Sequence, residues 1–153
     1  MSYKNQSDLY LEDNISKYPA IDLLCKMGYK YISPEECIEQ RGSNYNVILK
    51  EILRAQLHNL NKYEYGGSIF KFTAENVERA ISELDEPLTD GLVRTSEKIY
   101  DALMLGKSYL EKLVDGTAKS FNLKYIDWEH PENNVFHVTE EFSCDSWDKQ
   151  KNA

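Results

Sequence analysis

The sequence predicts a mixed fold, α+β or mixed α/β in class, in which a helical cluster comes first and strands follow. Before Gly106, apolar residues recur with the spacing of an amphipathic helix, as in the set Val77, Ala80, Ile81 and Leu84. After Gly106 they alternate with polar residues, which is typical of half-buried strands. We expect one domain over 1–153, made of a polar arm (1–12), a mainly helical part (13–106), strands (107–143) and a tail (144–153).

Composition narrows the class of protein. Hydrophobic residues make up 41% of the chain and charged residues 29%, which is typical of globular rather than disordered proteins. The net charge of −8 disfavours a domain that binds nucleic acid by itself, because phosphate neutralisation needs clustered lysines and arginines. No run of 18 apolar residues occurs, so we expect neither a signal peptide nor a membrane partner.

The first third of the chain predicts two helices. One starts near Asp13 or Ser16, accepts Pro19 in its first turn and ends at Gly28. A short extended piece follows over 29–32. The run Ser33-Pro34-Glu35-Glu36 has the order of a capping box and predicts a second, short helix to about Gln40.

Three longer helices are predicted next. The first covers Tyr45 to Leu60, where leucines and isoleucines share one broad face. Gly66-Gly67 marks a turn, with a brief strand around Ile69, Phe70 and Phe72. Thr73 caps a second helix that Pro87 stops, and a third runs from about Thr89 to Leu105.

Three strands are predicted after Gly106, over Ser108–Val114, Ser120–Ile126 and Val135–Ser143. Asp115-Gly116 is a hairpin signal between the first two. Trp128, between the second and third strands, is expected to anchor a loop in the core.

Glu140 is the one candidate neighbour of an active site. Alternation along the last strand places it on one face with Phe136, Val138 and Phe142, where a carboxylate could lie beside a metal site. The alternative is a carboxylate that projects into solvent near the strand end, because glutamate is rarely buried without a partner. No Glu or Asp in the chain is followed two positions later by Lys, so no second carboxylate comes with a lysine at that spacing.

An acidic cluster, Asp127, Glu129 and Glu132, surrounds Pro131 and precedes Asn133-Asn134. It could form a cation site. A structured loop before the last strand is favoured, because Asp, Asn and Pro stabilise turns for backbone reasons alone. Asp145 and Asp148 are interpreted as solvated tail residues.

Other candidate sites are weaker still. The lysines of the strand region suggest either a DNA-facing patch or a solvated sheet face, and they are Lys107, Lys112, Lys119 and Lys124. Gly66-Gly67-Ser68 lacks the Lys of a phosphate-binding loop, so no cofactor-binding residue is assigned. Cys25, Cys37 and Cys144 lack metal-site spacing and predict reduced thiols, so no metal ligand is assigned.

The run Tyr125-Ile126-Asp127-Trp128-Glu129-His130-Pro131-Glu132-Asn133-Asn134, continuing through Val135 to Phe142, resembles the restriction (R, HsdR-type) subunit of type I restriction-modification enzymes. Weaker stretches occur in the family's order, namely Tyr18-Pro19-Ala20-Ile21 to Gly28-Tyr29, Leu53-Arg54-Ala55-Gln56-Leu57, Asp90-Gly91-Leu92-Val93-Arg94-Thr95 and Leu105-Gly106-Lys107-Ser108. Together they extend the resemblance from about Leu9 to Ser143.

The resemblance implies part of a restriction-endonuclease-like PD-(D/E)xK sheet at the front of a bacterial or archaeal, cytoplasmic protein. The whole subunit would use Mg²⁺ to cleave unmodified DNA and ATP to translocate it, together with methyltransferase and specificity subunits. Its metal-binding Asp and Glu-x-Lys would follow Ala153, so this fragment is expected to be inactive alone. Some family members carry a Glu in the first helix where this chain has Lys17 and Pro19, and no role is transferred there.

Two further expectations accompany this one. A sheet that lacks central strands has an open edge, so we expect the isolated fragment either to self-associate or to have a disordered C-terminal end. The alternative function is an acidic, non-enzymatic protein-interaction domain.

Overall fold

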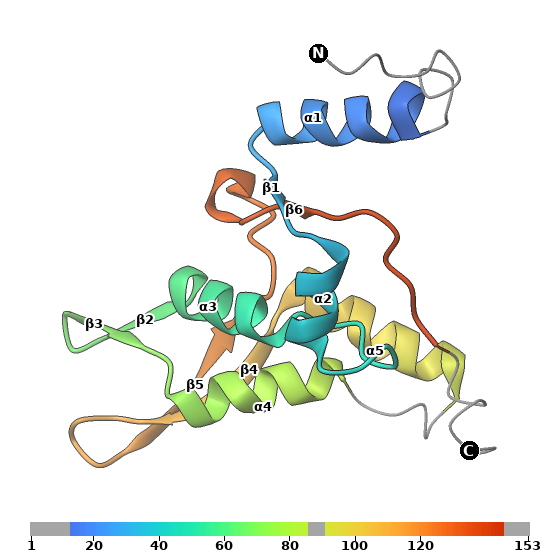
Figure 1. The fold of residues 1–153 in the computed structure, drawn as a ribbon. Helices are drawn as coiled ribbons and strands as arrows, with labels where there is room; N and C mark the ends of the chain where they lie inside the picture. Colours follow the sequence, from blue (N-terminus) through green and yellow to red (C-terminus); the bar gives the residue numbers. More distant parts are fainter. Residues whose placement is uncertain (1–12, 86–90, 146–153) are drawn as a thin grey trace. The chain divides into compact units, whose positions relative to one another are not determined.

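A computed structural model describes residues 13–85 and 91–145 (Figure 1). It combines helices with small two-stranded sheets, which confirms the mixed α+β class. The predicted arm, Pro87 and Asp148 lie outside the described residues. The chain divides into two compact units. Unit 1 takes the described parts of Met1–Val47 and Val135–Ala153, and unit 2 is formed by Ile48–Asn134. Among the described residues, no helix combines the length and apolar character needed to cross a membrane.

Unit 1 begins with a π-helical turn, η2 (Asp13–Lys17), that continues into α1 (Tyr18–Lys26). Strand β1 (Lys30–Tyr31) and helix α2 (Pro34–Arg41) follow. Ser33 caps α2 as predicted, because its hydroxyl accepts a hydrogen bond from the Glu36 amide at 3.2 Å. Both helices expected in this region are therefore confirmed.

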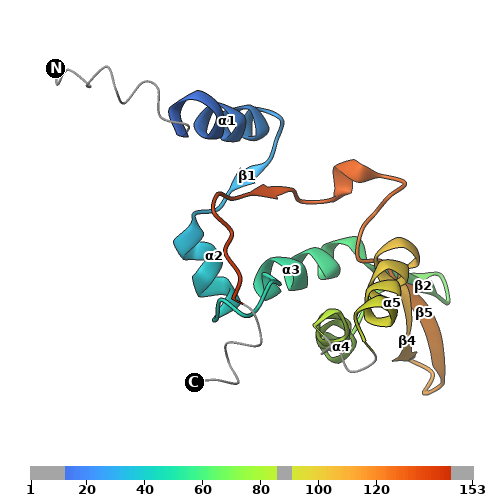
Figure 2. The ribbon, with the colours of Figure 1, turned by 90° about the vertical axis from the view of Figure 1, so that its right-hand side faces the viewer.

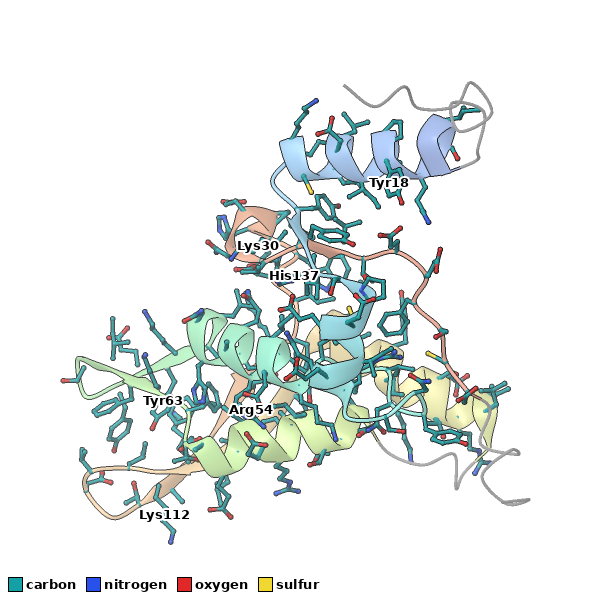
Figure 3. The ribbon with its side chains drawn as sticks, viewed as in Figure 1. Tyr18, Lys30, Arg54, Tyr63, Lys112 and His137 are labelled. Carbon is teal, nitrogen blue, oxygen red and sulfur yellow. The ribbon has the colours of Figure 1, made fainter. Side chains whose placement is uncertain are left out.

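The last strand of unit 1 is much shorter than predicted. Strand β6 (His137–Val138) pairs in parallel with β1, with Lys30 opposite His137 (Figure 3). The expected strand Val135–Ser143 is therefore wrong in extent. The partner strand offers only two residues before Pro34 begins α2, and Glu141 adopts a left-handed φ of 50° that ends extended structure.

Unit 2 starts with helix α3 (Lys50–Leu60), which begins five residues later than the predicted Tyr45. Strands β2 (Lys62–Tyr65) and β3 (Ser68–Lys71) form an antiparallel hairpin around Gly66-Gly67. The strand β2 was not predicted. Helix α4 (Ala74–Leu84) is capped by the Thr73 hydroxyl as predicted. Helix α5 (Leu92–Leu105) ends at Gly106 as predicted, and its expected start at Thr89 lies outside the described residues.

Strands β4 (Lys107–Lys112) and β5 (Ala118–Leu123) form the second hairpin of unit 2, and the loop that follows contains the short 3-10 helix η3 (Pro131–Asn133). Figure 2 shows the hairpin from another side. Strand β5 ends at Leu123 rather than the predicted Ile126. The reason is that the buried Asn61 side chain, rather than a neighbouring strand, pairs with the backbone of Lys124. It accepts a hydrogen bond from the Lys124 amide at 2.7 Å and donates one to the Lys124 carbonyl at 2.8 Å.

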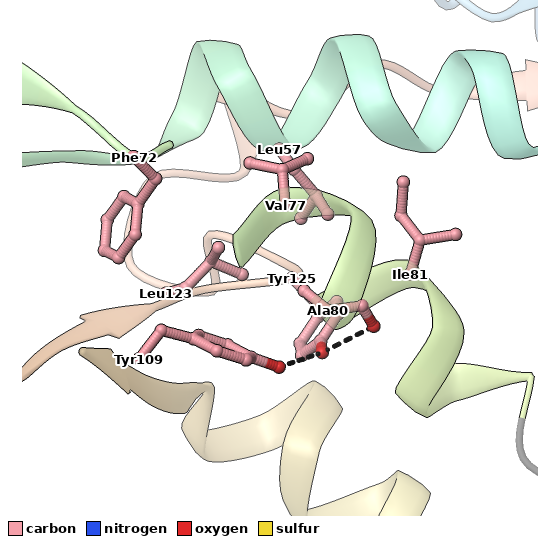
Figure 4. Close-up of a cluster of buried hydrophobic side chains, with 8 residues drawn as sticks. All are labelled: Leu57, Phe72, Val77, Ala80, Ile81, Tyr109, Leu123 and Tyr125. Carbon is pink, nitrogen blue, oxygen red and sulfur yellow. Dashed lines mark hydrogen bonds between the residues drawn. The ribbon is translucent and has the colours of Figure 1, made fainter. Parts of the chain in front are cut away.

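The core of unit 2 lies where α3 and α4 meet the β4–β5 hairpin (Figure 4). Its fully buried side chains include Leu57, Val77 and Leu123. Two buried tyrosines satisfy their hydroxyls inside this core: Tyr125 donates to the Ala80 carbonyl at 2.9 Å, and the two hydroxyls of Tyr125 and Tyr109 are 3.2 Å apart. Arg54 of α3 pairs with Glu78 of α4 at the surface (Figure 3).

Trp128 is not the core anchor that was predicted. Its side chain is 54% exposed, and its indole N–H donates to the Leu103 carbonyl at 3.0 Å. Trp128 thus lies at the surface of unit 2, with its indole N–H bonded to helix α5.

Candidate functional site

Glu140 lies two residues past β6 and is held by two partners in unit 1. Its Oε1 accepts a hydrogen bond from the Tyr31 hydroxyl at 2.9 Å, and its Oε2 pairs with the Lys17 ammonium at 3.0 Å. Its side chain is 17% exposed. The structure therefore favours neither a free carboxylate in solvent nor a buried unpaired one. Glu140 thus connects the end of β6 to β1 through Tyr31 and to the π-helical turn η2 through Lys17.

The same lysine bridges two neighbouring carboxylates, because Lys17 also lies 3.0 Å from Glu141. The hydrogen bond to Glu140 raises the pKa of the Tyr31 hydroxyl above its usual value. Lys17, at the end of η2, is therefore a cation that faces Glu140. Over residues 13–85 and 91–145, no three His, Cys, Asp or Glu side chains gather closely enough to hold a metal ion.

The acidic cluster forms the predicted loop. Asp127 accepts hydrogen bonds from the His130 amide at 3.2 Å and the Asn133 side chain at 3.0 Å, and Lys124 lies 3.7 Å away. The Asn134 side chain adds three hydrogen bonds within the loop: it accepts one from the Asp127 amide and donates to the carbonyls of Asp127 and Pro131. The hydrogen bond from Asn133 lowers the pKa of the Asp127 carboxyl below its usual value. Both oxygens of the Asp127 carboxylate thus accept hydrogen bonds from within the loop.

The four candidate lysines do not assemble into one patch. Lys107 lies 2.7 Å from Glu83, and Lys124 pairs with Asp127 and Glu129. The register of β4 and β5 places Lys112 and Lys119 on opposite faces of the hairpin, since Glu111 is opposite Lys119. Figure 3 shows Lys112 on the β4–β5 hairpin. Asp145 is partly exposed, and its amide donates a hydrogen bond to the Asn44 carbonyl at 3.0 Å.

Sequence reasoning missed the buried carboxylate of Glu111. Its Oε1 accepts hydrogen bonds from the Thr73 amide (3.0 Å), the Thr73 hydroxyl (3.1 Å) and the Asn76 side chain (2.9 Å), so it closes the N-terminus of α4. Its Oε2 has no hydrogen-bond partner in the described part of the chain. The available signal was alternation, which places Glu111 on the face of Tyr109 and Leu113.

Two hollows flank the end of α5 in unit 2. A larger one of about 300 Å³ is bordered by Glu83, Asp101 and Lys107, and a smaller one of about 170 Å³ by Met104, Lys124 and Trp128. Leu105 and Gly106 line both. Glu83 is partly buried, which alone would raise its pKa, but hydrogen bonds from Lys107, Tyr109 and Arg79 bring the pKa below its usual value. The larger hollow is therefore bordered by the ion pair between Lys107 and Glu83.

Comparison with known proteins identifies a family match. Residues 9–153 match the sequence model of a family described as the N terminus of type I restriction enzyme R proteins. The match covers nearly the whole chain, including the loop around Asp127 and the segment that carries Glu140. Neither a curated protein nor a solved structure matches the chain.

Proposed function

Because the chain belongs to the family of type I restriction enzyme R protein N termini, we propose that it forms the front part of the nuclease domain of such a subunit. The family match over residues 9–153 is the observation that carries the proposal. In the complete enzyme, Mg²⁺-dependent cleavage of unmodified DNA would accompany ATP-driven translocation. The methyltransferase and specificity subunits would be its partners, and the cell interior its location.

The small sheet of unit 1 supports a restriction-endonuclease-like scaffold. Strands β1 and β6 are parallel, and parallel strands in proteins normally belong to larger sheets that are covered on both faces. Helix α1 is amphipathic, yet none of its residues is buried. Both features fit a layered domain to which further strands are added.

The catalytic residues would come from those further strands. None of the glutamates or aspartates in these 153 residues is followed two positions later by lysine. Glu140, held by Lys17 and Tyr31 beside the sheet, would be a neighbour of the metal site rather than its main ligand. We propose that the chain cuts no DNA by itself.

The test uses an R subunit that begins with this chain, assembled with methyltransferase and specificity subunits. We expect the assembly to linearise unmodified plasmid only with ATP and Mg²⁺, and the isolated chain to leave the plasmid intact. Failure of the assembly to cleave, or cleavage by the isolated chain, contradicts the proposal.

The role of Glu140 has its own test in the same assembly. Glu140→Ala is expected to slow cleavage at least about tenfold while ATP hydrolysis continues, since the change lies at the nuclease sheet. Glu39→Ala, an exposed change on α2, is the control. Cleavage at the control rate would remove Glu140 from the site without affecting the family assignment.

The second candidate function is an acidic protein-interaction domain. The net charge of −8 and the exposed apolar side chains of α5 favour it. An inactive assembled enzyme that still forms a stable complex through this chain would support this alternative.

A further inference from the structure

Arg41, the last residue of α2, is a buried cation in unit 1. Only 4% of it is exposed, although arginine is rarely buried without a partner of opposite charge. Within residues 13–85 and 91–145, its hydrogen-bond acceptors are three backbone carbonyls and one sulfur, and none is a carboxylate. Because a buried charge is costly unless hydrogen bonds replace its lost hydration, these contacts are what makes the burial of Arg41 possible.

The acceptors come from three parts of unit 1. The Arg41 Nε donates to the carbonyl of Cys37, one turn earlier in α2, at 3.3 Å. The Nη1 atom donates to the carbonyls of Asn46 at 3.0 Å and Ser143 at 3.1 Å, and also to the sulfur of Cys144 at 3.5 Å. One guanidinium thus connects α2 with the loop that follows it and with a segment 102 residues later (Figure 2).

Segment 139–145, which follows β6, has no strand partner, because none of its residues lies in a helix or strand. Three consecutive residues of this segment contact Arg41, because the centre of the Phe142 ring also lies 4.1 Å from the guanidinium carbon. Arg41 therefore seats the end of the segment on α2.

The same segment carries Glu140, two residues before Phe142. Glu140 is held from the other side by the Tyr31 hydroxyl at 2.9 Å and the Lys17 ammonium at 3.0 Å. The segment is thus fixed at two points, one at Glu140 and one at Arg41. Such supports matter for catalysis, since a misplacement of about 1 Å can slow a reaction by about a hundredfold.

We infer that Arg41 is a positioning residue for the DNA cleavage proposed above. Its contacts seat segment 139–145 on α2 and thereby set the place of Glu140 beside the metal site. Arg41 acts through this segment and not on the metal or the DNA, because its guanidinium is buried against backbone carbonyls. The inference rests on the proposed function and adds a residue of α2 to those that position Glu140.

The first test measures hydrogen exchange in the 153-residue chain and needs no metal. Arg41→Gln should speed exchange of the Asp145 amide, which donates to the Asn44 carbonyl at 3.0 Å, by at least about tenfold. Exchange of the Ile32 amide, which bonds within the β1–β6 pair, should stay unchanged. Arg94→Gln, the same substitution at an exposed position of α5, is the control and should change neither amide.

The second test uses the assembled enzyme and varies the Mg²⁺ concentration. Arg41→Gln should slow plasmid cleavage at least about tenfold and raise the Mg²⁺ concentration for half-maximal cleavage at least about threefold, while ATP hydrolysis continues. A loss of folded protein would lower the rate without moving that concentration. Arg94→Gln should behave like the original enzyme in both respects.

Phe142→Leu keeps the inference testable if Arg41→Gln does not fold. It removes only the ring beside the guanidinium, and Phe142 is 41% exposed, so folding should be retained. We expect faster exchange of the Asp145 amide and a higher Mg²⁺ requirement, each by a smaller factor than for Arg41→Gln.

The possible failures are distinguishable. An assembly with the original chain that cleaves no DNA overturns the proposed function, and this inference falls with it. Original cleavage and Mg²⁺ dependence in both variants overturn this inference alone. Equal acceleration of the Asp145 and Ile32 amides would show that Arg41 stabilises unit 1 as a whole and positions nothing.

Discussion

Gly106 joins α5 directly to β4, and a methyl group at this position would overlap neighbouring atoms. Its φ is 73°, and a Cβ placed there would lie 2.5 Å from the Leu123 carbonyl oxygen and 2.9 Å from the Asn122 side chain. Glycine alone accommodates both the left-handed backbone and this approach. Packing thus explains why a glycine stands within the stretch Leu105-Gly106-Lys107-Ser108, one of those that resemble the family.

Gly106→Ala is therefore expected to lower the free energy of unfolding by at least about 2 kcal/mol, combining backbone strain with a steric overlap. Gly67→Ala is the matched control, since Gly67 has a φ of 77° but no atom within 4 Å of an added Cβ. It should cost only about 1 kcal/mol. Urea unfolding followed by circular dichroism measures both, and equal losses would contradict the steric argument.

Glu111 holds the N-terminus of α4 from a neighbouring strand. Glu111→Ala leaves the amide and hydroxyl of Thr73 without their buried acceptor, and we expect a loss of about 2–4 kcal/mol in the free energy of unfolding. Glu111→Gln keeps an acceptor and should lose less. Lys112→Ala, on the exposed face of the same strand, should have little effect. A similar small effect for all three variants in thermal unfolding would show that Glu111 is not structurally important.

Prediction from sequence is limited here by distance along the chain. Alternation places Glu111 on the inner face of β4, but a lone carboxylate on an apolar face has no visible partner in the local sequence. Its donors come from Thr73, 38 residues earlier, and from Asn76. Trp128 shows the opposite failure, because its hydrophobicity predicts burial while a hydrogen bond to Leu103 holds it at the surface.

At the scale of elements, helices were predicted better than strands. Ser33, Thr73 and Gly106 mark helix ends by local chemistry that the sequence displays directly. Strand ends depend on distant partners: Asn61 ends β5 by binding Lys124, and the shortness of β1 limits β6. The loop around Asp127 was predictable because each of its partners lies within seven residues.

That loop provides a test by pH. The pKa of the Asp127 carboxyl is lower in the folded state than in the unfolded state, so the ionised form stabilises the fold. This stabilisation is fully present above about pH 4, the usual pKa of an Asp carboxyl. This stabilisation is lost as pH falls through the lowered pKa. Asp127→Asn should therefore be less stable than the original chain near pH 7, and the difference should shrink in acid. A difference that stays constant from about pH 7 to about pH 3 would contradict the assigned role.

At the scale of the whole molecule, the open edges of the β1–β6 pair have the largest consequence. The amides of Lys30 and Ile32 bond to the carbonyls of Phe136 and Val138, so strand alternation directs the backbone of His137 to the other edge of β6. Among the described residues no third strand pairs with β1 or β6, and a strand edge without a neighbour is a template for another strand.

We therefore expect concentration-dependent self-association in sedimentation velocity, reduced by His137→Pro, which removes the outward N–H. His137→Ala is the control, since it shortens the side chain and keeps that N–H. A monomer at all concentrations, or equal effects of the two changes, would contradict edge pairing.

The most direct test of the central claim is the coding sequence downstream of codon 153. The nuclease proposal predicts that it continues into an apolar strand with a metal-binding Asp, followed by Glu-x-Lys on the next strand. A stop codon directly after Ala153, or a continuation without these carboxylates, would contradict the proposal and favour the protein-interaction function.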